Sequence, residues 1–181
     1  MKSGMDEHLK ILHEAWVSLL DDCEKIYQWR WYVHEREEDI RSYLFCKILH
    51  ILNKRRLEVM NLHADIPIMN RKRADIVLGS SEDIWNLGVE IKRSISRAIM
   101  EEQLNKLKDF IANKKIGCGV FLAIISHSYN LKEMLDYWGF KEKFKLEERD
   151  CGNNNFIEWR RIIVKDADID WDTLFLVLRT L

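Results

Sequence analysis

The chain has 181 residues, of which 47% are apolar and 33% are charged, and its formal net charge is −1. This length and composition predict one folded domain over residues 1–181 with a sizeable core, and they exclude an intrinsically disordered chain. The balanced net charge neither indicates nor excludes a nucleic-acid partner, because the distribution of charge matters more than its sum.

The spacing of cysteine and histidine argues against a zinc or disulfide protein. The four cysteines, at positions 23, 46, 118 and 151, form no CxxC pair, and the six histidines form no HExxH motif. Scattered cysteines favour reduced thiols and a cytoplasmic location. The sequence contains no apolar run of membrane-spanning length and no export leader, so we expect no membrane partner.

Hydrophobic spacing predicts elements in the order α, α, β, β, β, α, β, α, β, α. The run at 117–126 is bounded by glycine and predicts a strand buried on both faces, while Pro67 marks an edge or a bend of the first strand. A three-strand meander, a helical crossover and a buried central strand predict a mixed α/β sheet flanked by helices. The helices are expected at 5–27, 33–53, 97–113, 131–138 and 171–179, and the strands at 57–69, 74–78, 87–92, 117–126 and 156–164.

The hairpin formed by the second and third strands carries charged residues inside apolar runs. Asp75 opens ADIVL, and Glu90 lies within LGVEIK two residues before Lys92. Residues i and i+2 of a strand share a face, so Glu90 and Lys92 point the same way, and hairpin pairing can bring Asp75 beside Glu90. Two carboxylates are suitable ligands for Mg²⁺ or Mn²⁺, which would polarise a phosphoryl oxygen and activate water.

Other polar residues in the flanking helices extend this pattern. Glu37 follows the apolar spacing of the second helix, where a carboxylate needs a partner or a metal. Glu38 is displaced by about 100° around the helix and is the weaker candidate. Gln103 lies on the helix after the third strand. The alternative interpretation is an ordinary α/β protein in which these residues form surface ion pairs.

This constellation resembles the PD-(D/E)XK nuclease superfamily, which has the restriction-endonuclease-like fold. The match covers Glu37 in EREEDIRSYL, Asp75 in RADIVL, Glu90 and Lys92 in VEIK, and Gln103 in EEQLNKL. The predicted α-β-β-β-α-β order is also the order of the family core. The spacing is most similar to the archaeal Holliday-junction-resolvase and Mrr-like branches. One departure is Ala74, which stands where the family has proline, a residue that is not a ligand.

The resemblance implies a three-layer nuclease core at 33–126, with a helical addition at 1–31 and a carboxyl-terminal extension of the same domain at 127–181. It also implies a function and a role for each site residue. Asp75 and Glu90 would bind the metal, with Glu37 supporting a second metal or its water. Lys92 would position or activate water, and Gln103 would orient Lys92 or the phosphate. A homodimer is expected, because cutting two strands requires two sites.

Basic residues border the proposed site and are candidates for phosphate contacts, which supply affinity without sequence information. An alternative role is protection of a hairpin edge against aggregation. They are Arg71, Lys72, Arg73, Arg93 and Arg97.

The sequence hypothesis is therefore a Mg²⁺- or Mn²⁺-dependent endonuclease that hydrolyses DNA phosphodiester bonds. The alternative is a catalytically inactive nucleic-acid-binding or assembly module with the same fold. Trp16 is expected in the core, and Trp29 and Trp31 are expected to pack against the domain or a second subunit rather than to stack on bases.

Overall fold

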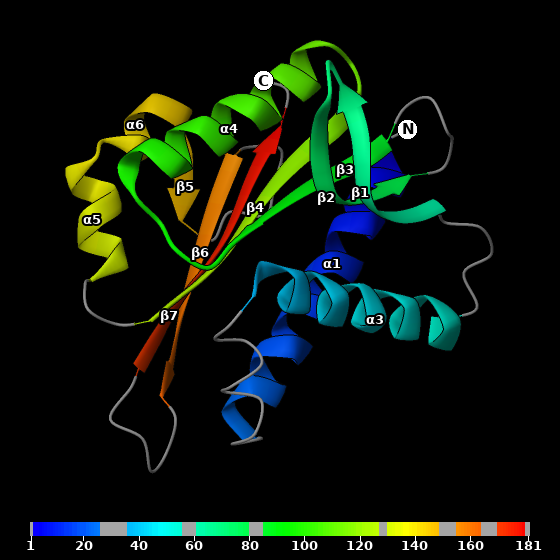
Figure 1. Cartoon of the computed structure of the whole chain (residues 1–181), viewed down its shortest axis with the longest axis horizontal. Helices are drawn as coiled ribbons and strands as arrows, with labels where there is room; N and C mark the ends of the chain where they lie inside the picture. Colours follow the sequence, from blue (N-terminus) through cyan, green and yellow to red (C-terminus); the bar gives the residue numbers. More distant parts are fainter. Residues whose placement is uncertain are drawn as a thin grey trace.

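A seven-stranded mixed β-sheet lies between two groups of helices in the computed structural model (Figure 1). The structure describes residues 2–25, 36–55, 61–79, 85–126, 130–148, 155–163 and 170–179. The strand order across the sheet is β1-β2-β3-β4-β7-β6-β5. The elements are α1 (Lys2–Lys25), α3 (Glu37–Arg55), β1 (Asn61–Met69), β2 (Lys72–Gly79), β3 (Trp85–Lys92), α4 (Arg97–Ala112), β4 (Ile116–Ser126), α5 (Leu131–Tyr137), α6 (Phe140–Phe144), β5 (Leu146–Glu148), β6 (Asn155–Ile163) and β7 (Asp170–Arg179).

Two hydrophobic clusters cover the two faces of the sheet. On one face, α1 and α3 pack their apolar residues against the strands, including Val89 and Ile91 of β3. On the other face, α4, α5 and α6 pack against residues that include Phe121 of β4 and Leu176 of β7. The predicted α/β class, with a mixed sheet flanked by helices, is confirmed. None of the described helices combines the length and apolar character that a membrane crossing requires.

The predicted meander and crossover are present. β1 pairs antiparallel with β2, and β2 pairs antiparallel with β3. α4 then connects β3 to β4, which is parallel to β3. β1 is an edge strand whose register shifts between Pro67 and Met69, as expected for a strand interrupted by proline. β4 lies between β3 and β7 and is almost entirely buried, which explains its continuous apolar run.

Local sequence signals account for several helix boundaries. The first turn of α3 carries three acidic residues and its last turn carries Lys54 and Arg55, which complements the helix dipole at both ends. The Ser96 hydroxyl accepts a hydrogen bond from the Ile99 N–H and caps α4. α5 is capped by the predicted Asn130, and Gly139 follows it with a φ of +68°, a conformation that glycine adopts without strain.

The helix predicted at 171–179 is wrong, because this segment forms β7. β7 pairs antiparallel with both β4 and β6 and is buried along nearly its whole length. Its core, LFLVL at 174–178, is a short continuous apolar run, and periodicity cannot distinguish such a run from a buried helix. Two short elements, α6 and β5, were also not predicted.

The remaining predicted elements agree with the structure within a few residues. Trp85 begins β3, two residues before the predicted start. Trp16 of α1 is buried in the core, as predicted. Trp29 and Trp31, and the proposed ends of elements at 26–27, 33–35 and 57–60, lie outside the described residues.

The packing of α4 on β4 depends on the absence of a side chain at Gly119. A Cβ atom built there would lie 2.9 Å from the Leu107 Cβ of α4, too close for two carbon atoms. At Gly88 of β3, the nearest contact of an added Cβ is the flexible end of Ile116, at 3.0 Å. We expect Gly119→Ala to lower the free energy of unfolding by about 1–3 kcal/mol and to cost more than Gly88→Ala. Urea denaturation of both variants measures this, and a smaller loss for Gly119→Ala would contradict the packing described.

Candidate active site

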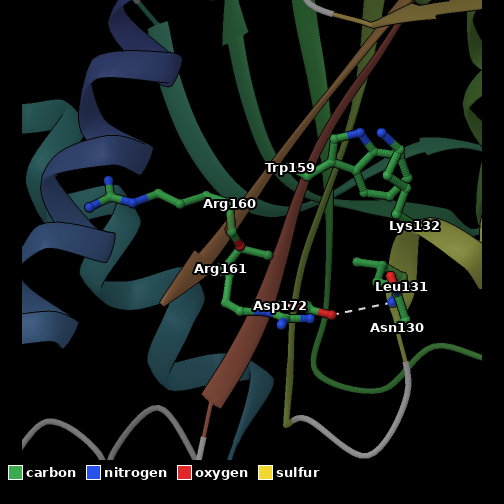
Figure 2. Close-up of a pocket in the computed structure, with 8 residues that line it drawn as sticks. Asn130, Leu131, Lys132, Trp159, Arg160, Arg161 and Asp172 are labelled. Carbon is green, nitrogen blue, oxygen red and sulfur yellow. Dashed lines mark hydrogen bonds and ion pairs between the residues drawn. The ribbon is translucent and has the colours of Figure 1, made fainter. Parts of the chain in front are cut away.

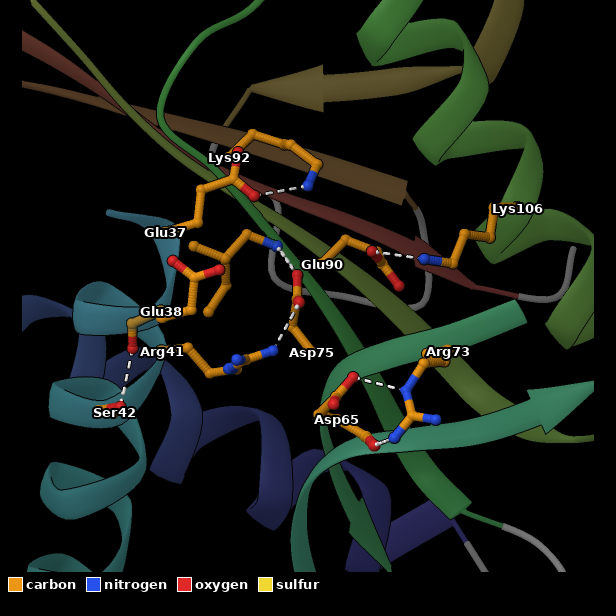
Figure 3. Close-up of polar contacts among 11 residues, drawn as sticks. Glu37, Glu38, Arg41, Ser42, Asp65, Arg73, Asp75, Glu90, Lys92 and Lys106 are labelled. Carbon is orange, nitrogen blue, oxygen red and sulfur yellow. Dashed lines mark hydrogen bonds and ion pairs between the residues drawn. The ribbon is translucent and has the colours of Figure 1, made fainter. Parts of the chain in front are cut away.

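The pairing of β2 with β3 brings Asp75 and Glu90 together. Ile76 pairs with Val89, so the same antiparallel register places Asp75 opposite Glu90. The Ile91 N–H donates a 2.7 Å hydrogen bond to Asp75 Oδ2, so the aspartate side chain binds the neighbouring strand just past the last paired residues (Figure 3). Asp75 therefore lies inside β2, binds the backbone of β3 through its side chain and lies near a second carboxylate.

Glu90 is a deeply buried carboxylate. Val89 and Ile91 face α1 and α3, so Glu90 between them points to the α4 side of the sheet. Glu90 is only 1% exposed, and its Oε2 lies 2.8 Å from Lys106 Nζ. Its Oε1 is buried without a hydrogen-bond partner among the described residues. Burial raises the pKa of Glu90 to about 7, and the adjacent Asp75 adds to the rise, while Lys106 opposes it.

Asp75 is partly buried, and three cations act on its carboxyl. Burial raises the pKa of its carboxyl, although the Ile91 amide, Lys92, Lys106 and Arg41 all act in the opposite direction. Arg41 of α3 forms a long ion pair with Asp75, with 3.5 Å between Nη1 and Oδ1. The two neighbouring carboxylates thus share an environment that disfavours their charge, which a bound divalent cation would reverse.

Lys92 pairs with Glu37 across the gap between β3 and α3. Its Nζ lies 2.8 Å from Glu37 Oε2. Partial burial lowers the pKa of Lys92, but Glu37, Asp75 and Glu90 together outweigh it and raise that pKa. Lys92 is therefore an ammonium cation at neutral pH in this arrangement.

The structure distinguishes between the two candidate glutamates of α3. Glu37 is half-buried and contacts Lys92. Glu38 is exposed, and its backbone carbonyl accepts a hydrogen bond from the Ser42 hydroxyl. Glu37 is thus the α3 glutamate that contacts β3, through Lys92.

Gln103 is buried on α4, and its Oε1 has no hydrogen-bond partner among the described residues. The α4 side chain in contact with the carboxylates is Lys106, three residues further along the helix. Neither Lys106 nor Arg41 was predicted from the sequence. A signal was available for each, because Arg41 is four residues after Glu37 and Lys106 is three after Gln103, and such spacings lie on one side of a helix.

The five basic residues differ in their surroundings. Lys72 pairs with Asp109 at 2.9 Å, and Arg73 pairs with Asp65 at 2.6 Å, both at exposed positions. Arg71 lies exposed in the β1–β2 turn, Arg97 lies exposed at the start of α4, and Arg93 is half-buried just after β3. The ion pairs of Lys72 and Arg73 compete with any phosphate that they would bind.

A cavity of about 220 Å³ lies apart from this cluster (Figure 2). Its lining comes from β6, β7 and the start of α5, and includes Trp159 and Lys132. Its carboxylate, Asp172, accepts hydrogen bonds from the Leu131 N–H at 3.2 Å and from Arg161 Nε at 3.0 Å. Asp172 thereby ties β7 to α5 and β6.

The donor set around β2 and β3 fits a hard divalent cation. Asp75 and Glu90 supply adjacent carboxylate oxygens, the ligands that Mg²⁺ and Mn²⁺ prefer, and one Glu90 oxygen has no partner. Within the described part of the chain, no three His, Cys, Asp or Glu side chains converge as a ready ligand cluster. The Glu37 carboxylate instead contacts Lys92. A metal here would bind to two carboxylates supplemented by backbone or water oxygens.

Comparison of the chain with known proteins finds no similar protein. No protein-family model, curated protein or solved structure matches the chain. The comparisons therefore do not test the resemblance to a nuclease family.

The buried Glu90 should make folding stability depend on pH. An unfolded glutamate releases its proton near 4.5, whereas folded Glu90 retains it to about 7. Between these values the folded state binds more protons, so stability falls as the pH rises through this window and then levels off. Glu90→Gln removes this contribution, so we expect the variant to gain stability relative to the parent between about pH 5 and pH 8.

Thermal unfolding of the two proteins across that range measures the effect. Glu102→Gln, at an exposed position on α4, is the control and should follow the parent curve. Parallel curves for Glu90→Gln and the parent would contradict the described burial of Glu90.

Proposed function

We propose that this protein is a metal-dependent endonuclease that hydrolyses DNA phosphodiester bonds and belongs to the PD-(D/E)XK nuclease superfamily. The observation that carries the proposal is the meeting of Asp75 and Glu90 on adjacent strands, with one buried Glu90 oxygen left without a partner. An ordinary core avoids burying two carboxylates side by side, because each loses its hydration. Their burial is readily explained if a divalent cation binds there.

The order of the elements around the site supports the restriction-endonuclease-like fold. α3, β1, β2, β3, α4 and β4 follow the α-β-β-β-α-β order of that family core. The meander β1-β2-β3 and the parallel β4 lie in one sheet, with α3 and α4 on opposite faces. In this arrangement α1 is an amino-terminal addition, and β5, β6 and β7 extend the sheet beyond β4.

Each residue of the cluster has a role in such a reaction. Mg²⁺ or Mn²⁺ would supply Lewis acidity to the phosphoryl oxygen and lower the pKa of the attacking water. Asp75 and Glu90 would bind the metal, with the Ile91 carbonyl as a further oxygen. Lys92 is cationic, so its role is to orient the attacking water and offset negative charge on the phosphate. Glu37 holds Lys92 from the side of α3 and would support a second metal or its water.

The proposed substrate is DNA, with phosphates flanking the cut site held by basic residues near β2 and α4. Arg93, Arg97 and Arg71 fit this role best, because Lys72 and Arg73 are engaged by Asp109 and Asp65. We also propose that the protein forms a homodimer, in which two copies cut the two DNA strands, and that it is cytoplasmic.

The second candidate function is a catalytically inactive nucleic-acid-binding or assembly module. It is favoured by the ion pairs of the cluster, because Asp75, Glu90 and Glu37 each already contact a protein group. In such a module these contacts would hold α3 and α4 to the sheet without any metal.

Cleavage assays distinguish the two functions. We expect the parent protein to cut plasmid or branched DNA in the presence of Mg²⁺ or Mn²⁺. Asp75→Asn and Lys92→Met should each lower the rate by about 10²-fold or more, because each removes charge stabilisation at the reacting phosphate. Gel analysis of product formation over time measures these rates.

The two glutamates of α3 supply a matched pair of variants. Glu37→Gln should slow cleavage, whereas Glu38→Gln should not, because Glu38 is exposed and does not contact Lys92. A parent protein that cuts none of the DNA substrates would overturn the proposed activity. Full activity of Asp75→Asn would overturn the assignment of the site.

A further inference from the structure

Lys106 is the cation closest to the most deeply buried carboxylate of the site. It extends from α4, with buried Leu104 and Leu107 nearby on the helix, and its own side chain is 19% exposed. Its Nζ lies 2.8 Å from Glu90 Oε2. Figure 3 shows Lys106 extending from α4 to Glu90, whereas Lys92 of β3 pairs with Glu37, a residue of α3.

The cluster is balanced in formal charge. The carboxylates of Glu37, Asp75 and Glu90 are matched by Lys92, Arg41 and Lys106. Arg41 Nη1 lies 3.5 Å from Asp75 Oδ1, which is a long ion-pair distance, and Lys92 forms its ion pair with Glu37. Lys106 is therefore the ion-pair partner of Glu90, and removing it would leave a buried carboxylate without its counter-ion.

We propose that Lys106 is an internal counter-ion that takes the place of a divalent cation at Glu90 in the metal-free protein. This inference rests on the proposed metal site. An ammonium group and a divalent cation are both attracted to the Glu90 carboxylate and repel each other. A metal ion that binds Glu90 must then displace the Lys106 ammonium from Oε2 or bind despite the repulsion between the two positive charges. In either case Lys106 lowers the affinity of the site for metal.

The same contact has a second consequence for the metal-free protein. Lys106 stabilises a fold that would otherwise contain an unpaired buried carboxylate. Loss of Lys106 should therefore weaken the metal-free protein while strengthening metal binding. A residue with only a structural role would produce the first effect without the second.

Isothermal titration calorimetry with Mn²⁺, with all proteins at the same pH, tests the proposal. We expect Lys106→Met to bind Mn²⁺ roughly tenfold tighter than the parent, because the competing positive charge is gone. Lys106→Arg keeps the charge and should bind like the parent. Lys108→Met is the matched control, because Lys108 lies over the Phe144 ring and does not pair with Glu90. Loss of binding in Asp75→Asn would locate the titrated ion at this site.

Thermal unfolding is the second measurement. The melting temperature of Lys106→Met should fall below that of the parent without metal and rise more than that of the parent when Mn²⁺ is added. If Lys106→Met does not fold, Lys106→Gln is used in both measurements. Equal or weaker Mn²⁺ binding by the neutral variants, or no binding by any protein, overturns the proposal. Both measurements are made without DNA. A protein that binds Mn²⁺ but does not cleave DNA would therefore count against the proposed function and not against the role of Lys106.

Discussion

The burial of Glu90 in the middle of β3 is the constraint on which the site depends. β3 is held by β2 on one side and by β4 on the other, so its backbone cannot move to expose the side chain. A carboxylate fixed in this way loses its hydration, and protein groups must compensate. Lys106 supplies part of that compensation from α4, and Asp75 beside it adds to the electrostatic cost.

The elements around β3 each contribute charged side chains to its surroundings. β2 and β3 place Asp75 opposite Glu90, α3 brings Glu37 and Arg41, and α4 brings Lys106. Each helix is therefore linked to the sheet by ion pairs as well as by its apolar face. If the cluster binds a divalent cation as proposed, stability and function oppose each other here, because the same buried charges cost folding free energy.

The sequence predicted the hairpin and its carboxylates because strand alternation and turn position are local properties. Helical spacing favoured Glu37 over Glu38, and in the structure Glu37 pairs with Lys92, whereas its role in a site stays a prediction. It missed β7 because a short apolar run fits either a buried strand or a helix, and only pairing with β4 and β6 decides. Lys106 was not predicted because its contact with Glu90 spans the interface between α4 and the sheet, whereas the family resemblance pointed to Gln103 on the same helix.

The central claim is that Asp75 and Glu90 jointly bind a divalent cation. A crystal structure of the protein soaked with Mn²⁺, with the anomalous signal of the metal recorded, tests it most directly. We expect a Mn²⁺ peak between the two carboxylates, at about 2.0–2.2 Å from an oxygen of each, as for a small hard cation. A map without a peak at this position, in which Glu90 still contacts Lys106, would contradict the claim.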